Sequence, residues 1–424
     1  PHVHLVGGRR HRPVEHTADD LERRVAPAMR VLFSCVPGFG HFHPMVPLAQ
    51  ALADAGHGVA FATAERFCSR VIAPAGFETF AAGLSPHIAY QQTMDLPEVA
   101  DLAPDDVWTE GALMFAKVAG PAKVDDLGGA VASFGADLVI HDTTDFAGPL
   151  AAAQAGIAWA AQSFGAVQPP QFWEAAGELV APAWQQRGLE PGPLGGMFRY
   201  LYLDICPPGF QDPSIADVAT AHPLRPVTFD TTAGESLPVW ASELPPAPTV
   251  YVTLGTIANQ ATEVFEAVLS GLGSSPYNVI VTVGPDRDPA EFGLQPGNVH
   301  IESYLPQSLL FPRCDAVVCH GGSGTVLAAL ANGLPLLVLP QGANQFWNAE
   351  RCVALGAGLS LSPAELSPEA IGGAVRALVE DGAYRSRAGQ LRTEIEQMPA
   401  PAEIVPVLER LARECEPVTS ASGR

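Results

Sequence analysis

The sequence has few positively charged residues. It contains 23 Lys and Arg against 45 Asp and Glu in 424 residues, a formal net charge of -22. Such a surface repels phosphate backbones and anionic lipid headgroups, so we expect neither nucleic acid nor a membrane surface as a partner. An anionic substrate would need a local site of its own.

Long apolar runs and paired cysteines are also missing. Apolar segments such as 146–161 are broken by Gly, Pro or Gln before they reach the roughly 18 residues of a membrane span. The seven cysteines include no C-x-x-C pair, which fits a reduced, cytoplasmic protein in which they are small buried side chains. Residues 1–28 contain no apolar signal region, and we expect them to be a disordered extension or tag.

The remaining sequence alternates between strand-like and helix-like segments. A chain of this length holds two or three domains with full cores. From Arg30 onward, strand-like segments that are apolar at nearly every position are followed by glycine turns and helices, which is typical of buried parallel strands. After a Pro-rich linker at 226–248, a second such series begins. We therefore predict an α/β fold with two Rossmann-like lobes that face a central cleft.

The domain boundaries follow from these segments. The first lobe is expected at 29–225 and the second at 249–400, with a helix and tail at 401–424. Within the first lobe, 85–125 and 164–213 lack clear periodicity, and we expect loops and short helices that line a pocket. The expected strands are 30–36, 59–63, 136–142, 157–161, 249–255, 278–284, 298–303, 316–321 and 334–340.

The loop PGFGHFHP at 37–44 follows the first strand directly. A dinucleotide-binding G-x-G-x-x-G motif would need a third glycine where His43 stands, so a dehydrogenase is only a minor alternative. His41 would face the cleft at the start of a helix, and histidine is the usual general base near neutral pH. It can equally be a loop histidine that caps the helix.

Asp142 closes the buried strand 136–142, so it is expected at the carboxyl end of the sheet, beside the same cleft. A carboxylate there can accept a hydrogen bond from one imidazole nitrogen of His41 and stabilise the protonated ring. Asp142, like Asp145 three residues later, can also be a simple helix cap.

The segment 320–350 is the most informative. His320 and the run GGSGT follow a strand and open a helix, where free N–H groups and the helix dipole bind an anionic diphosphate. The absence of a Walker Gly-Lys-Ser/Thr ending argues against a P-loop NTPase. Asn344 and Gln345 follow the next strand, where their amides can bind sugar hydroxyls. A purely structural glycine turn is the alternative.

Four segments together resemble the GT-B glycosyltransferases of family 1: GHFHP at 40–44, ADLVIHD at 136–142, YLPQ at 304–307 and HGGSGT…NQFWNAERC at 320–352. They are most similar to actinobacterial enzymes that glycosylate antibiotics and other natural products from dTDP- or UDP-sugars. The resemblance spans 30–415 and implies that the final helix, 401–415, crosses back onto the first lobe.

The resemblance also implies roles for individual residues. His41 would be the general base of an inverting transfer, and Asp142 its carboxylate partner. No metal or other cofactor is expected beyond the nucleotide-sugar co-substrate, and the D-x-D sequence at 286–288 is interpreted as a solvated turn. The implied donor site consists of Thr256, Tyr304, Leu305, His320, Gly322, Ser323, Gly324, Thr325, Asn344 and Gln345.

Two positions depart from the family pattern. Many members that use UDP-sugars have Glu eight residues after the motif histidine, where it binds the ribose hydroxyls, and here Ala328 stands there. Deoxyribose lacks the 2′-hydroxyl, so Ala328 favours a dTDP-sugar. Asn344 replaces Asp, and because an amide accepts weaker hydrogen bonds than a carboxylate, a deoxysugar donor is indicated.

The acceptor is expected to be a hydrophobic aglycone such as a polyketide or macrolide, because aromatic side chains concentrate in the first lobe. Each of them can equally belong to the core. A nucleotide-sugar epimerase or hydrolase and a non-catalytic nucleotide-sugar-binding partner subunit remain alternatives, and a homodimer is left open. The predicted acceptor residues are Phe42, Trp108, Phe115, Phe164 and Trp173.

Overall fold

The computed structural model describes residues 28–103, 106–230, 235–255, 261–284 and 287–419. The extension predicted at 1–28 lies outside these ranges except for its last residue. Thr256 of the predicted donor site and Asp286 of the D-x-D sequence also lie outside the described residues.

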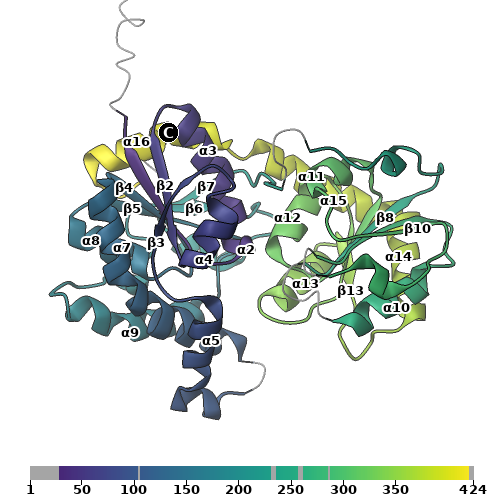
Figure 1. Cartoon of the computed structure of the whole chain (residues 1–424), viewed down its shortest axis with the longest axis horizontal. Helices are drawn as coiled ribbons and strands as arrows, with labels where there is room; N and C mark the ends of the chain where they lie inside the picture. Colours follow the sequence, from purple (N-terminus) through teal and green to yellow (C-terminus); the bar gives the residue numbers. More distant parts are fainter. Residues whose placement is uncertain (1–27, 104–105, 231–234, 256–260, 285–286, 420–424) are drawn as a thin grey trace, which may run out of the picture.

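In the described residues, the first lobe contains a seven-stranded parallel sheet with the order β3-β2-β1-β4-β5-β6-β7 (Figure 1). Its central strands β4 and β5 are buried at every residue, as parallel strands covered on both faces must be. The strands are β1 (Arg30–Ser34), β2 (Gly58–Thr63), β3 (Glu78–Ala81), β4 (Leu138–Asp142), β5 (Ala158–Gln162), β6 (Tyr202–Asp204) and β7 (Ala221–Pro223).

Helices cover both faces of this sheet. Alternate strand residues point to opposite faces: Leu32 and Val139 pack against α7, α8 and α9, whereas Val31 and Leu138 pack against α3 and α16. The helices of this lobe are α2 (Phe39–Phe42), α3 (Val46–Asp54), α4 (Glu65–Phe67), α5 (Pro86–Met94), α6 (Val107–Ala112), α7 (Gly120–Phe134), α8 (Ala147–Ala155) and α9 (Pro170–Gln185).

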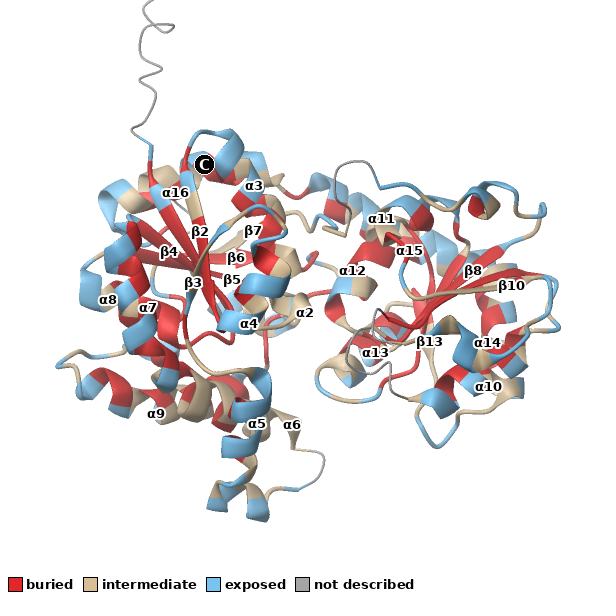
Figure 2. Cartoon of the chain, in the orientation of Figure 1, coloured by how far each residue is buried: buried red, intermediate tan, exposed pale blue. Residues whose placement is uncertain are grey.

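The second lobe repeats the arrangement on a six-stranded parallel sheet of described residues, with the order β10-β9-β8-β11-β12-β13. Its strands are β8 (Thr249–Thr253), β9 (Asn278–Thr282), β10 (Val299–Glu302), β11 (Ala316–Cys319), β12 (Leu336–Val338) and β13 (Gly358–Ser360). Its helices are α10 (Thr262–Leu272), α11 (Gln307–Leu310), α12 (Ser323–Ala331), α13 (Gln345–Ala354), α14 (Pro368–Glu380) and α15 (Gly382–Gln397). Both sheets form buried centres in Figure 2.

The last helix, α16 (Pro401–Glu414), returns to the first lobe, where it lies beside α3 (Figure 1). Its side chains Ile404 and Leu408 are fully buried in the same cluster as Val46 and Leu52 of α3. The lobes also share apolar contacts, because Leu327 of α12 packs into this first-lobe cluster. The lobes are therefore joined by the linker, by α16 and by packed side chains.

One prediction about the first lobe is wrong. The stretch 164–213, predicted to form loops and short helices, contains the 16-residue α9 and strand β6. The stretch 85–125 does form loops and short helices, including the nine-residue α5 and the six-residue α6. The buried residues of α9 do have helical spacing. The helix was not predicted because its aromatic residues suggested a pocket lining and because Pro182, a helix-breaking residue, lies inside it. Strands β6 and β7 have three residues each, too few for a pattern to show.

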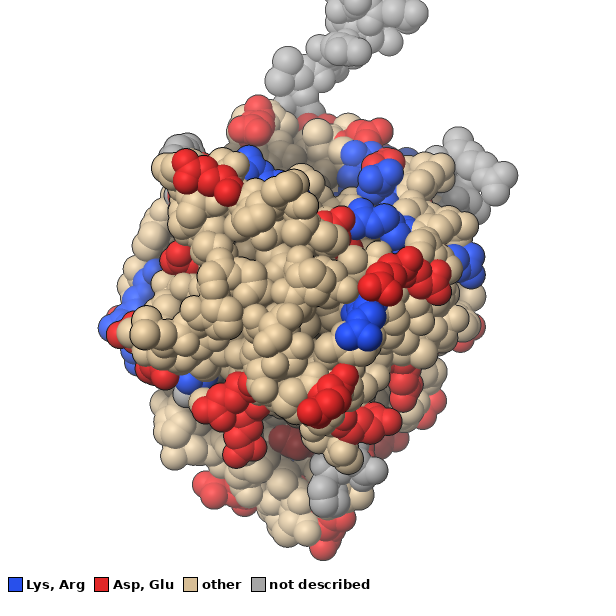
Figure 3. Space-filling view, turned by 90° about the vertical axis from the view of Figure 1, so that its right-hand side faces the viewer, with Lys and Arg blue, Asp and Glu red and all other residues tan. Residues whose placement is uncertain are grey.

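Six of the seven cysteines are buried free thiols, as expected, but Cys415 at the end of α16 is exposed. Figure 3 shows acidic side chains in separate clusters on the second-lobe face, with fewer basic ones and a broad uncharged area near its centre. Among the described residues, no helix is both long and apolar enough to cross a membrane.

Candidate active site

A cavity of about 450 Å³ lies between the lobes, lined by residues that follow the carboxyl ends of strands in both sheets. His41 and Phe164 line it from the first lobe. The cavity brings together all the described residues predicted for the donor site: Tyr304, Leu305, His320, Gly322, Ser323, Gly324, Thr325, Asn344 and Gln345.

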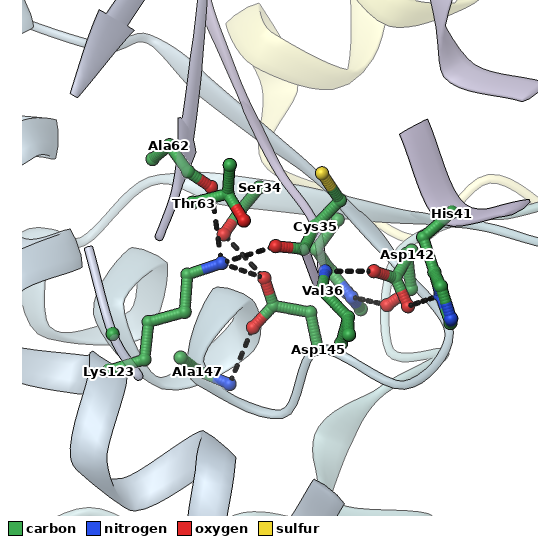
Figure 4. A network of polar contacts seen from close by, with 12 residues as sticks. Ser34, Cys35, Val36, His41, Ala62, Thr63, Lys123, Asp142, Asp145 and Ala147 are labelled. Atoms are coloured by element: carbon green, nitrogen blue, oxygen red, sulfur yellow. Dashed lines mark hydrogen bonds and ion pairs between the residues drawn. The ribbon is translucent and has the colours of Figure 1, made fainter. Parts of the chain in front are cut away.

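Two neighbouring strands of the first sheet place His41 and Asp142 at the same edge. His41 lies on α2, just after β1, and Asp142 ends β4, which pairs with β1. The Nδ1 atom of His41 is 3.4 Å from Oδ1 of Asp142 and 3.3 Å from Oγ1 of Thr144 (Figure 4). Because Nδ1 faces these oxygens, Nε2 on the opposite edge of the ring is left for a ligand in the cavity.

Asp142 is almost fully buried and is held ionised by its neighbours. Its Oδ2 accepts a hydrogen bond from the Val36 N–H at 2.7 Å, and its Oδ1 accepts from the N–H and Oγ1 of Thr144 at 2.7 and 2.6 Å. Burial raises the pKa of Asp142, but the charge of His41 and these hydrogen bonds outweigh burial and hold the pKa below its usual range. Asp142 can therefore orient the imidazole and stabilise its protonated form.

Thr144 is a site residue that the sequence analysis missed. It contacts both members of the His41–Asp142 pair. A hydroxyl residue two positions after an Asp at a strand end is the pattern of an Asx-type turn, which could have indicated it.

The second lobe presents the start of α12 to the cavity. Among the described residues, no side chain caps this helix, so its first N–H groups are free to bind an anion. Ser323 Oγ accepts hydrogen bonds from Nδ2 of Asn344 and of Asn348, at 3.0 and 3.1 Å. The hydroxyl proton of Ser323 is consequently available to a ligand.

His320 lies beside this helix start, between two glycines. A Cβ atom at Gly255 would lie 2.6 Å from the ring, and one at Gly322 would lie 2.5 Å from its Nε2 atom. Burial lowers the pKa of His320 to about 4, although the Thr253 carbonyl partly offsets this effect. The ring is therefore neutral near pH 7 and can donate one N–H.

Of the predicted acceptor set, Phe164 lines the cavity, and Phe115 lies beside His41 without lining it. The rings of Phe164 and Phe115 flank the His41 ring, with centroids 4.6 and 6.3 Å away. Phe42 is wrong as an acceptor residue because it is fully buried and packs against Phe61.

Trp173 is also wrong, since it lies on the buried face of α9, packs against Phe198 and is 3% exposed. Trp108 is partly buried and packs against Phe172, with ring centroids 6.2 Å apart, and it is not among the residues that line the cavity.

The linker contributes residues that no motif indicated. Phe229 and Asp230 line the cavity, and the Asp230 carbonyl accepts a hydrogen bond from the Tyr304 hydroxyl. The Asp230 carboxylate accepts from the Ser308 N–H at 2.8 Å. Across the cavity wall, burial lowers the pKa of His43 to about 4, and Asp230 opposes that shift. The segment predicted only to connect the lobes thus also forms part of the site.

In the described ranges, no group of three or more His, Cys, Asp or Glu side chains is placed to hold a metal ion. Asp288 of the D-x-D sequence accepts a hydrogen bond from the Ala290 N–H and caps the short helical turn at 289–292.

Comparison with known proteins identifies the family. The C-terminal domain model of erythromycin biosynthesis protein CIII-like proteins matches residues 266–411. The L-demethylnoviosyl transferase of Streptomyces niveus is 33% identical over 399 residues, which cover 93% of this chain and 100% of that protein.

Solved structures agree over the full length of both lobes. The glycosyltransferase SnogD from Streptomyces nogalater superimposes with a TM-score of 0.75 at 30% identity, over 91% of this chain and 100% of that one. The spinosyn rhamnosyltransferase SpnG complexed with thymidine diphosphate gives a TM-score of 0.75 at 26% identity, over 90% and 100% of the two chains. The chain belongs to the GT-B glycosyltransferases of antibiotic and related natural-product biosynthesis.

Proposed function

We propose that this glycosyltransferase moves a deoxysugar from a dTDP-sugar to a hydroxyl group of a hydrophobic natural-product aglycone, with inversion at the anomeric carbon and without a metal ion. The observation that carries the proposal is the His41–Asp142 pair, which lies on the wall of the same cavity as the free N-terminus of α12. One wall offers a general base and the other an anion site.

In the proposed reaction, Nε2 of His41 takes the proton of the acceptor hydroxyl as its oxygen bonds to the anomeric carbon. The bond from that carbon to the diphosphate oxygen breaks on the opposite face, through an oxocarbenium-like state. Asp142 stabilises the imidazolium that forms, because it stays ionised and contacts Nδ1.

The leaving diphosphate would gain negative charge beside the start of α12. The N–H groups there and the Ser323 hydroxyl are fixed before the substrate arrives, so they need little reorganisation during the reaction. Support for a thymidine nucleotide comes from the structural similarity to SpnG with thymidine diphosphate. Ala328 also supports it, since it lines the cavity where a ribose-binding carboxylate would otherwise stand.

A hydrophobic acceptor is supported by Phe164 and Phe115, whose rings flank the proposed base. Flat or lipophilic molecules bind well between such rings. A reduced, cytoplasmic setting and a homodimer stay predictions.

His41→Ala tests the proposed function. The variant should bind dTDP as the wild type does, but its turnover of dTDP-sugars with hydrophobic acceptors should fall by roughly 10²–10⁴-fold, the usual contribution of a general base. His87→Ala is the matched control, because His87 is exposed on α5. A His41→Ala enzyme with wild-type turnover would rule out His41 as the base.

A further inference from the structure

A charged side chain lies on the buried face of α7. The other inward-facing residues of this helix are apolar, yet the side chain of Lys123 is only 8% exposed. A buried ammonium group is costly unless it is paired and fully hydrogen-bonded. Gly83 also makes room for it, because a Cβ atom there would lie 3.0 Å from the Lys123 stem.

All the hydrogen-bonding capacity of this ammonium group is used. Lys123 Nζ donates to the carbonyls of Cys35 at 2.9 Å and Ala62 at 3.1 Å, and to Oδ2 of Asp145 at 2.7 Å (Figure 4). The Asp145 carboxylate also accepts from Ser34 Oγ at 2.5 Å and from the Ala147 N–H at 3.1 Å. The pair therefore joins α7, β1, β2 and the turn after β4.

The same two backbone segments carry the proposed catalytic pair. Ser34 and Cys35 bind the Lys123–Asp145 pair, and the next residue, Val36, donates its N–H to Asp142. On the other segment, the Asp145 N–H donates to the Asp142 carbonyl at 3.0 Å. His41 lies five residues beyond Val36. A shift of either segment would therefore change the contact between His41 and Asp142.

We propose that the Lys123–Asp145 ion pair positions the His41–Asp142 pair by fixing the end of β1 against the turn after β4. The inference rests on the proposed function only in so far as His41 and Asp142 are taken to be catalytic. The alignment of the two side chains can be measured without substrate.

The experiment follows the carbethoxylation of His41 by diethyl pyrocarbonate, using peptide mass spectrometry between pH 5 and 8. The reagent attacks the neutral ring, so the pH midpoint of the rate reports how strongly a neighbouring carboxylate stabilises the protonated ring. Asp142→Asn sets the reference, because its midpoint should lie below the wild-type value once the neighbouring negative charge is gone.

The double variant Lys123→Met/Asp145→Asn removes both charges together, so no unpaired buried charge remains. Its midpoint should fall measurably from the wild-type value towards that of Asp142→Asn. Ser34→Ala removes only the hydroxyl that links β1 to Asp145, and it should shift the midpoint in the same direction by a smaller amount. Ser34→Ala keeps the test open even if the double variant does not fold.

Leu127→Ala is the matched control, because Leu127 lies one turn further along α7 and is fully buried. It should destabilise the lobe and leave the midpoint unchanged. The proposal is overturned if the double variant and Ser34→Ala keep the wild-type midpoint, or if Leu127→Ala shifts it equally. If His41→Ala keeps full turnover, the proposed function fails, and the midpoints still decide whether Lys123 positions the pair.

Discussion

Ala328 lies on the cavity wall in the middle of α12 and is 6% exposed. The neighbouring Leu327 points into the first-lobe core, so the identity of residue 328 affects the ligand more directly than the packing between the lobes. The proposed preference for a thymidine nucleotide can therefore be tested at this one side chain.

Ala328→Glu should shift binding from dTDP towards UDP. The carboxylate would accept hydrogen bonds from ribose hydroxyls, and because such a bond to a charged group contributes about 1.5–3 kcal/mol, the ratio of dTDP to UDP affinity should fall about tenfold or more. Calorimetric titration of both nucleotides in EDTA measures the ratio. An unchanged ratio, or a wild type that prefers UDP, would contradict the role given to Ala328.

The packing of His320 explains why glycines stand at positions 255 and 322, on either side of its ring. Gly255 has a φ of +73°, a left-handed backbone that other residues rarely adopt, and the imidazole occupies the space where its Cβ would be. The glycines therefore make room for a protein side chain as well as for a ligand.

At the scale of elements, the position of the first turn of α12 depends on how His320 packs against Gly322. Gly322→Ala would bring a Cβ atom within 2.5 Å of His320 Nε2, so either the ring or the helix start must move. We expect the affinity for dTDP to fall about tenfold or more, because each hydrogen bond to a charged phosphate contributes about 1.5–3 kcal/mol.

Gly373→Ala on α14 is the control for that variant, since no atom lies within 4 Å of the position of its Cβ. It should bind dTDP with wild-type affinity. If both variants bind dTDP equally well, the geometry of the helix start is not what binds the diphosphate.

At the scale of the whole molecule, loops after β5 and β6 connect the lobes. Arg351 of α13 donates to the carbonyls of Gly209 and Phe210 at 2.9 and 3.1 Å, and Glu394 of α15 accepts from the Gly209 N–H at 2.7 Å. The helix that begins at the proposed sugar site is thus anchored to the first lobe.

Gly165 of the first lobe lies beside Ser323 of the proposed diphosphate site. A Cβ atom there would lie 2.4 Å from Ser323 Oγ, which Asn344 and Asn348 hold in place. Gly165→Ala should therefore keep the cleft from closing and lower turnover about tenfold or more, because correct placement of the reacting groups is lost.

Small-angle scattering with dTDP would show this directly, as a larger radius of gyration for Gly165→Ala than for the wild type. Gly128→Ala on α7, where the added methyl group meets no atom within 4 Å, is the matched control. Identical scattering and turnover for the two variants would show that the Gly165 contact does not limit closure.

Stability should fall in mild acid. Burial lowers the pKa of His43 and His320 from 6.5 to about 4, and burial raises that of Asp204 from 3.8 to about 6 despite hydrogen bonds from Gln211 and the Cys206 N–H. Burial also lowers the pKa of His141 and His222. In mild acid, unfolding therefore takes up protons at these histidines and releases one at Asp204.

The net uptake means that the free energy of unfolding should fall by about 2 kcal/mol or more from pH 7 to pH 5. Urea denaturation at the two pH values measures the change. His43→Asn, which cannot take up that proton, should reduce the loss, and equal stability of the wild type at both pH values would contradict these pKa shifts.

The two parallel sheets and much of the site could be predicted from the sequence alone. The signals for them are local: each strand, and each turn that follows it, shows its own pattern of neighbouring residues. Runs such as 30–36 are apolar at nearly every position, and the run GGSGT after a strand predicts an open helix start. His41 and Asp142 follow strand ends, and parallel strands bring their carboxyl ends to one edge.

Only the tertiary structure decided which side chains from distant segments meet. Phe42 and His41 are adjacent in sequence, yet Phe42 is fully buried in the core and His41 lines the cavity. Lys123, Asp230 and Arg351 owe their contacts to residues 22 or more positions away. Such contacts depend on how whole helices and strands pack together, and the local sequence pattern does not indicate that packing.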